Sequence, residues 1–145
     1  MVSKQKQGAL RFVALMLCAA AILTMIACEA APKDFSFKNE LNTPVNIYFS
    51  RSDDDEWSDK PTAENVRSGG EVGISFEKID SSSGKKFDIG AIDENSINYD
   101  VYEVVLVSGD IVALTGDSSS AKFIITHEDG TQTEFSALIK ENAGK

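Results

Sequence analysis

Hydrophobic and polar residues alternate along most of the chain after residue 34, with the period of two that half-buried β-strands show. Clusters of Gly, Ser, Asn and Asp, which favour turns, separate the alternating segments. These segments lie at residues 35–37, 45–49, 72–76, 87–91, 102–107, 111–114, 123–125 and 135–139. The pattern predicts an all-β domain of about seven or eight short strands.

Short strands with turn signals at fairly regular intervals are typical of an antiparallel β-sandwich. The immunoglobulin-like arrangement is one candidate for its topology, and a barrel is the alternative architecture. The Asp129-Gly130 pair is a strong hairpin signal before the last alternating segment. We expect a single sandwich domain at residues 35–139, followed by a C-terminal tail at residues 140–145.

Two segments do not fit this simple pattern. Residues 51–70 form a connection that is unusually long for a compact domain. Within it, we expect residues 61–66 to form a short helical turn, because Pro61 suits the first position of a helix. Residues 92–100 are expected to be a second, smaller irregular region.

The first 27 residues have a different pattern from the rest of the chain. Lys4, Lys6 and Arg11 precede a run without charge that extends from Phe12 to Ala27. A basic start followed by an apolar run is the layout of a secretory signal. The run is shorter than the roughly 20 residues of a membrane-spanning helix, so a signal helix that is removed is favoured over a permanent anchor.

The apolar run ends in Met25-Ile26-Ala27-Cys28, which resembles the lipobox of bacterial lipoproteins. In that family the cysteine thiol receives a diacylglyceryl group, the chain is cut before the cysteine, and the new amine is often acylated. The resemblance implies that Cys28 carries a covalent lipid and that residues 28–34 are a short tether. The alternative is ordinary secretory cleavage, which leaves a free thiol.

The cysteine count agrees with lipidation. Cys18 lies inside the apolar run and is removed with the signal, so Cys28 is the remaining cysteine and no intramolecular disulfide can form. A lone cysteine in an exported chain needs an explanation, and a lipid supplies one. Residues 29–34 reach about 20 Å when fully extended. We therefore expect the domain to lie close to the membrane surface.

The chain is strongly acidic, with a formal net charge of −9. The signal holds Lys4, Lys6 and Arg11 and no acidic residue, so its removal makes the remainder more negative. Such a charge repels nucleic acid and anionic lipids. We expect contact with the membrane through the lipid alone, at the extracytoplasmic face. In many Gram-negative lipoproteins an aspartate directly after the lipidated cysteine favours retention in the inner membrane. This chain has Glu29 at that position, so the resemblance favours the outer membrane if the cell has one.

The domain also resembles an uncharacterised family of bacterial secreted proteins and lipoproteins over roughly residues 35–114. The shared features are Asn39, Thr43, Val45, Ile47, Ser52, Asp55, Trp57, Gly70, Ile74, Phe76 and the Phe87-Asp88-Ile89 triplet. The leucines expected after the tryptophan are replaced by Lys60 and Pro61. The resemblance implies a β-sandwich and assigns no activity.

Sequence motifs for catalysis are absent. His127 is the single histidine, so a Cys/His metal set cannot form. A Ser-His-Asp arrangement would depend on His127 alone, which we expect to be an ordinary solvated residue near a hairpin. The sequence contains no P-loop, no G-x-S-x-G and no G-x-G-x-x-G. We therefore expect no catalytic residue and no cofactor beyond the lipid on Cys28.

The acidic run from Asp53 to Asp59 is the best candidate for ligand binding. Asp53, Asp55 and Asp59 are weak candidates for calcium ligands, although Ser58 stands where an EF-hand loop needs glycine. Consecutive acids are more often a solvated loop. Trp57, inside the run, is either an exposed anchor for a partner or, as we favour, a cover over an open end of the core.

The sequence thus predicts a non-catalytic envelope module, either structural or binding an envelope protein or glycan. One alternative is an envelope hydrolase that uses two carboxylates in one cleft. The other alternative is a calcium-dependent binding module that uses the Asp53–Asp59 loop.

Overall fold

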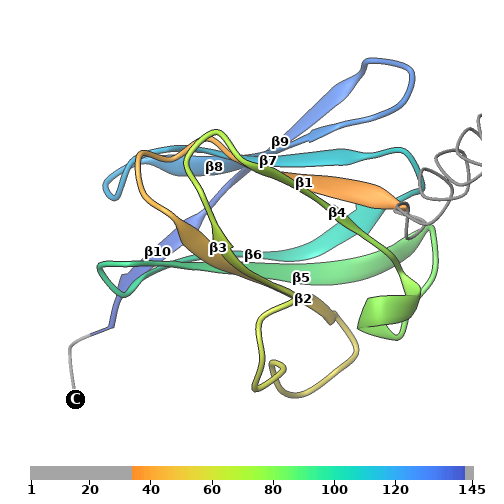
Figure 1. Ribbon diagram of the computed structural model, residues 1–145. Coiled ribbons are helices and arrows are strands. Elements are labelled where there is room, and N and C mark those ends of the chain that lie inside the picture. The colour runs from red at the N-terminus through yellow and green to blue at the C-terminus, as the bar shows by residue number, and fades with distance from the viewer. Residues whose placement is uncertain (1–33, 143–145) are drawn as a thin grey trace, which may run out of the picture. The chain divides into compact units, whose positions relative to one another are not determined.

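A computed structural model describes residues 34–142, which form ten strands and one short 3₁₀ helix. The strands make two five-stranded sheets that lie one above the other (Figure 1). This arrangement confirms the predicted all-β sandwich. Neighbouring strands are antiparallel except for one parallel pair, in which Phe37 lies opposite Val112.

The first sheet contains, in spatial order, β4 (Glu71–Ile74), β1 (Phe35–Asn39), β7 (Ile111–Gly116), β8 (Ala121–Thr126) and β9 (Gln132–Ser136). The second sheet contains β10 (Leu138–Glu141), β6 (Ile97–Leu106), β5 (Lys85–Asp93), β2 (Val45–Arg51) and β3 (Ala63–Val66). The 3₁₀ helix η1 (Glu77–Ile79) follows β4. The order of strands within each sheet is not evident from the sequence.

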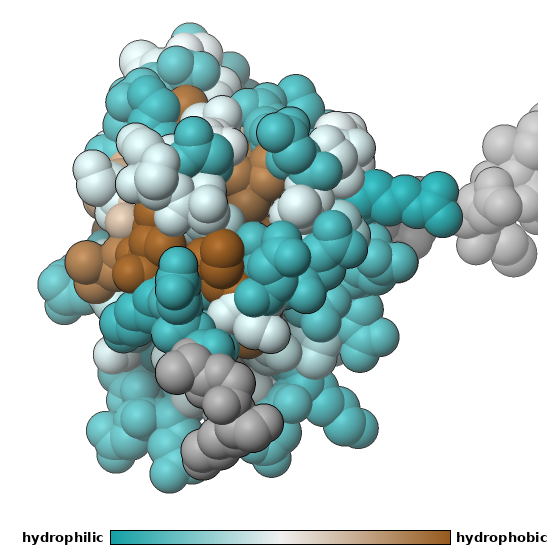
Figure 2. All heavy atoms as spheres, turned by 90° about the vertical axis from the view of Figure 1, so that its left-hand side faces the viewer, coloured by the Kyte–Doolittle hydropathy of each residue, from teal (hydrophilic) through white to brown (hydrophobic). Residues whose placement is uncertain are grey.

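The alternating hydrophobic residues form one core between the sheets. Phe37, Phe87 and Phe123 are fully buried there. Every buried side-chain nitrogen or oxygen within residues 34–142 has a hydrogen-bond partner. Figure 2 shows hydrophobic residues gathered between polar margins on the side of the sandwich that faces left in Figure 1. Since residues 34–142 contain a complete core and both sheets, we expect this part to fold by itself.

The last alternating segment of the sequence is two strands rather than one. β9 pairs with β8 in the first sheet, whereas β10 pairs with β6 in the second. The chain crosses between the sheets at Ala137, whose N–H donates to the carbonyl of Ala121 at 3.0 Å. A continuous period of two does not reveal such a change of sheet, because the alternation continues through it.

The helical turn expected at residues 61–66 was wrong. Residues 63–66 form β3, which adds to the edge of β2 with Val66 opposite Val45. Thr62 N–H donates to the carbonyl of Ile47 at 2.8 Å, and Asn65 N–H donates to Asn46 Oδ1 at 2.8 Å. Pairing with an edge strand therefore overrides the weak local signal from the proline.

The irregular region expected at residues 92–100 was also wrong, because β5 and β6 continue almost to their shared turn. The carboxylate of Asp93 organises this turn. It accepts hydrogen bonds from Asn95 N–H at 2.8 Å, from Ile97 N–H at 3.0 Å and from the Tyr99 hydroxyl at 3.0 Å. Asp93 is thus a buried structural acid and not a solvated one.

Burial and the hydrogen bond to Asp93 raise the pKa of Tyr99 from 10 to about 12. The unfolded chain releases this proton at lower pH than the folded domain does. The contribution to stability is therefore complete below about pH 10 and is lost as the pH rises through about 12. We expect denaturant titrations to show this loss in the wild type and not in Tyr99→Phe. Identical alkaline profiles would contradict the assignment.

Candidate functional site

The sequence-predicted Trp57 lies on the outer face of the second sheet. Its indole packs against Gly90 of β5, where a Cβ atom would lie 3.3 Å from Trp57 Cη2. The side chain therefore folds back onto the domain as expected, but onto a sheet face and not over an open end of the core. A strand glycine without a side chain leaves the space that the indole occupies. Trp57 remains 38% exposed.

An alanine at Gly90 is expected to displace Trp57. The backbone of Gly90 is not in the positive-φ region, so the effect is steric, caused by a Cβ within 3.4 Å of two ring atoms. Trp57 is the only tryptophan of the chain, and its fluorescence reports this change directly. We expect a red-shifted emission and stronger acrylamide quenching in Gly90→Ala. Ile124→Ala, in β8 of the other sheet, should leave both signals unchanged; unchanged signals in Gly90→Ala would contradict the packing.

Tyr102 of β6 stands beside Trp57 on the same face. The two ring centroids are 6.4 Å apart and the planes are inclined by 57°. Tyr102 is 40% exposed. A shift in register beside it places Glu103 at a φ of 57°, and the N–H of Glu103 donates to Asp88 Oδ1 at 3.0 Å. This irregularity in the strand pairing, a β-bulge, fixes the direction in which Tyr102 points.

Asp100 lies between these aromatic residues and the edge strand β10. It is opposite Gly90 in the strand pairing and is only 9% exposed. The hydroxyl of Tyr102 donates to Asp100 Oδ2 at 3.4 Å, and Lys140 Nζ lies 3.7 Å from the same oxygen. Burial raises the pKa of Asp100 above its usual value, although Lys140 and Tyr102 act in the opposite direction. We call Trp57, Tyr102 and Asp100 the aromatic–carboxylate face.

The three weak calcium candidates are not brought together. Asp53, Asp55 and Asp59 are exposed, and the carboxylate of Asp53 accepts hydrogen bonds from both Nε and Nη2 of Arg51. This hydrogen bonding lowers the pKa of Asp53. Within residues 34–142, no three His, Cys, Asp or Glu side chains converge as a metal site requires.

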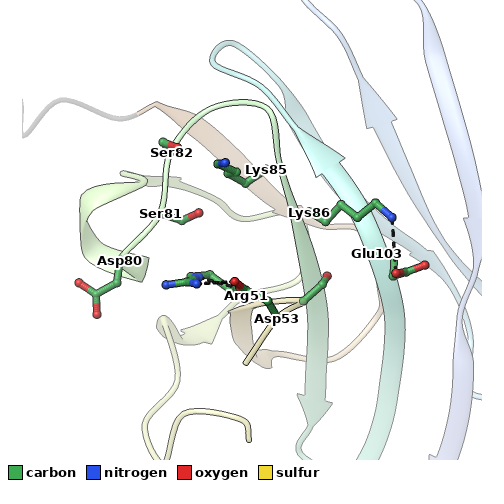
Figure 3. Close-up of a pocket in the computed structure, with 9 residues that line it drawn as sticks. Arg51, Asp53, Asp80, Ser81, Ser82, Lys85, Lys86 and Glu103 are labelled. Carbon is green, nitrogen blue, oxygen red and sulfur yellow. Dashed lines mark hydrogen bonds and ion pairs between the residues drawn. The ribbon is translucent and has the colours of Figure 1, made fainter. Parts of the chain in front are cut away.

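A polar pocket of about 550 Å³ lies between the end of β2, the start of β5 and the chain after η1. Figure 3 shows that Lys86 reaches toward Glu103 and that Asp80 points away from the centre. The Lys86–Glu103 pair is 3.5 Å apart, and Arg51 is held by Asp53. Asp53 and Glu103 therefore each face a base of the pocket, and the hydrolase alternative, which needs two carboxylates that converge in one cleft, gains no support from them.

His127 is more firmly held than the sequence predicts. Its Nδ1 lies 2.8 Å from Oδ1 of the fully buried Asp110. The other carboxylate oxygen of Asp110 accepts the N–H of Val107 at 2.9 Å. The histidine therefore joins the turn before β7 to the β8–β9 hairpin, which is a structural arrangement. The sequence analysis did not identify Asp110, at the end of the Ser108-Gly109-Asp110 turn, as the partner of His127.

Sequence reasoning found Trp57 and missed Tyr102 and Asp100, the other two members of the aromatic–carboxylate face. Gly90, against which Trp57 packs, carried a usable signal, since a glycine inside a strand often marks a close approach by another group. Asp100 and Tyr102 carried none, because they reach Trp57 only after strands far apart in sequence have paired. Asp100 lies in the segment expected to be irregular. The alternation at residues 102–107 placed Tyr102 on the same face as Val104 and Leu106, which was wrong, because the β-bulge turns Tyr102 outward while Val104 and Leu106 are buried.

The expected signal segment and Cys28 lie outside the described residues. Among residues 34–142, no helix has the length and hydrophobicity needed to cross a membrane. Comparison of the chain with protein-family models, with curated proteins and with solved structures finds no match.

Proposed function

We propose that the chain is an exported lipoprotein, held at the extracytoplasmic membrane face by a lipid on Cys28, and that its sandwich is a non-catalytic module that binds an envelope partner. The N-terminal pattern of basic residues, apolar run and Met25-Ile26-Ala27-Cys28 supports the anchor. The aromatic–carboxylate face supports the binding role.

The observation that carries the binding proposal is the exposure of two large aromatic side chains beside a nearly buried acid. Trp57 and Tyr102 are 38% and 40% exposed. Tryptophan and tyrosine are residue types that are enriched at interface hot spots. Both are fixed by local structure, Trp57 against Gly90 and Tyr102 beside the β-bulge. Binding to a fixed surface loses little conformational entropy, which favours affinity.

The test places a photo-crosslinking amino acid at Tyr102 in the lipidated protein, within the cells that make it. We expect a crosslinked adduct of defined mass, which is lost when Trp57→Ala is combined with the crosslinker at Tyr102. The matched control position is Lys122, which pairs with Glu134 on the first sheet at 2.8 Å. Equal adducts from both positions, or an adduct insensitive to Trp57→Ala, would contradict the proposed binding surface.

A further inference from the structure

We propose that the aromatic–carboxylate face binds a basic polypeptide segment, with one lysine or arginine cation in contact with Trp57 and Tyr102 and paired with Asp100. This inference deepens the proposed function by naming the chemistry of the partner, and it rests on the same face.

The two rings are close enough to each other for one cation to contact both. A cation is attracted to an aromatic face when it lies within about 6 Å of the ring centroid. The centroids of Trp57 and Tyr102 are 6.4 Å apart and the planes are inclined by 57°, so a single cation can satisfy this range for both rings. Glycine has no Cβ atom, and the position that a Cβ of residue 90 would occupy is 3.2 Å from Asp100 Oδ1 and 3.3 Å from Trp57 Cη2. The carboxylate therefore borders the indole directly.

Asp100 lacks strong partners in the domain. Its contacts with Tyr102 and Lys140, at 3.4 Å and 3.7 Å, both involve Oδ2, and both are longer than a good hydrogen bond. The side-chain hydrogen bond and the ion pair of Asp100 within residues 34–142 leave Oδ1 unused. Because every buried side-chain oxygen in this part of the chain has a partner, Oδ1 must reach the surface, where an incoming N–H donor can pair with it.

The surrounding charge favours a partner with several basic groups. The chain has a formal net charge of −9, and the loop that carries Trp57 presents exposed acids on both sides of it. These are Asp53, Asp54, Asp55, Glu56 and Asp59. A field of one sign attracts oppositely charged partners and raises their association rate. A basic polypeptide uses this field along its length, whereas a neutral glycan does not.

Lys140 provides the discriminating variant. Its ammonium is the chain's own cation at Asp100, and its side chain is 60% exposed. If the face binds cations, Lys140 competes with the partner, and Lys140→Ala strengthens binding. Lys122→Ala removes the same charge from the first sheet, beside Glu134. Comparison of these two variants separates competition at Asp100 from a general increase in negative charge.

The experiment titrates residues 29–145, which contain the complete core, with a pentalysine peptide by calorimetry. We expect binding that weakens with salt. Trp57→Ala and Asp100→Asn should each weaken it about tenfold, the loss of roughly 1.4 kcal/mol. Lys140→Ala should tighten it at least about threefold, while Lys122→Ala should stay within about twofold. Thermal melts establish that each variant is folded before it is titrated.

Several results would overturn the inference. Equal tightening by Lys140→Ala and Lys122→Ala would show that pentalysine senses only net charge. Butylammonium binding as tightly as pentalysine would show that the ligand is a small amine. Binding of a neutral chito-oligosaccharide that requires Trp57, without binding of pentalysine, would identify a glycan site. That last result would leave the proposed function intact, whereas failure of the crosslinker at Tyr102 to form any adduct in cells, with Trp57 unchanged, would remove the proposed function itself.

Discussion

Cys28→Ser is expected to abolish lipid attachment completely and to leave an uncleaved precursor in the cell. The thioether to the diacylglyceryl group requires the cysteine sulfur, and in lipoproteins of this pattern cleavage follows lipidation. The measurement is metabolic labelling with an alkyne fatty acid, followed by gel electrophoresis and mass spectrometry of the N-terminus. The wild type should carry the label on a mature chain that begins at Cys28.

Cys18→Ser is the matched control for this prediction. Cys18 lies within the apolar run and is expected to be removed with the signal, so the control should be labelled and processed like the wild type. Retained labelling in Cys28→Ser, or a mature wild-type chain that begins elsewhere with an unmodified thiol, would refute the lipoprotein assignment. The proposed binding by the sandwich would then concern a protein that is not anchored by lipid.

The sequence predicted those strands whose alternation places one clear face in the core. Val45, Ile47 and Phe49 of β2 are buried with polar neighbours between them, as a period of two requires. The sequence failed where pairing or side-chain hydrogen bonds decide the local structure. Only Val66 of β3 is buried, so β3 forms a strand because it pairs with β2. The β5–β6 turn depends on Asp93, whose three hydrogen bonds cannot be read from composition.

The candidate site was predicted only in part for a related reason. Trp57 was evident because it is the sole tryptophan, in an acidic loop. Its location over Gly90 depends on the path of a long loop, which local signals do not determine. The direction of Tyr102 depends on the β-bulge, and a one-residue change in register would turn it toward the core. Long-range pairing therefore creates the face from residues that look ordinary in the sequence.

Asn39→Ala is expected to cause the largest loss of stability among polar substitutions in the domain. Asn39 is fully buried at the end of β1. Its Nδ2 donates to the carbonyls of Thr43 and Val66, both at 2.8 Å, and its Oδ1 accepts the N–H of Leu41 at 3.0 Å. One side chain thus holds the β1–β2 turn and connects it to β3. Removing it takes one hydrogen bond from each of three backbone groups, at about 1 kcal/mol each, so we expect a loss of roughly 3 kcal/mol.

Denaturant unfolding of the domain measures this loss, and two further variants determine its cause. Asn39→Asp keeps the acceptor for Leu41 but replaces the donor by a carboxylate oxygen that faces two carbonyls, so it should not restore stability. Asn98→Ala removes an exposed hydrogen bond to Asn142 and should cost less than about 0.5 kcal/mol. Equal stability of Asn39→Ala and Asn98→Ala would show that the β1–β2 turn is held by the core alone. The predicted difference would instead give Asn39 a physical role that requires no ligand.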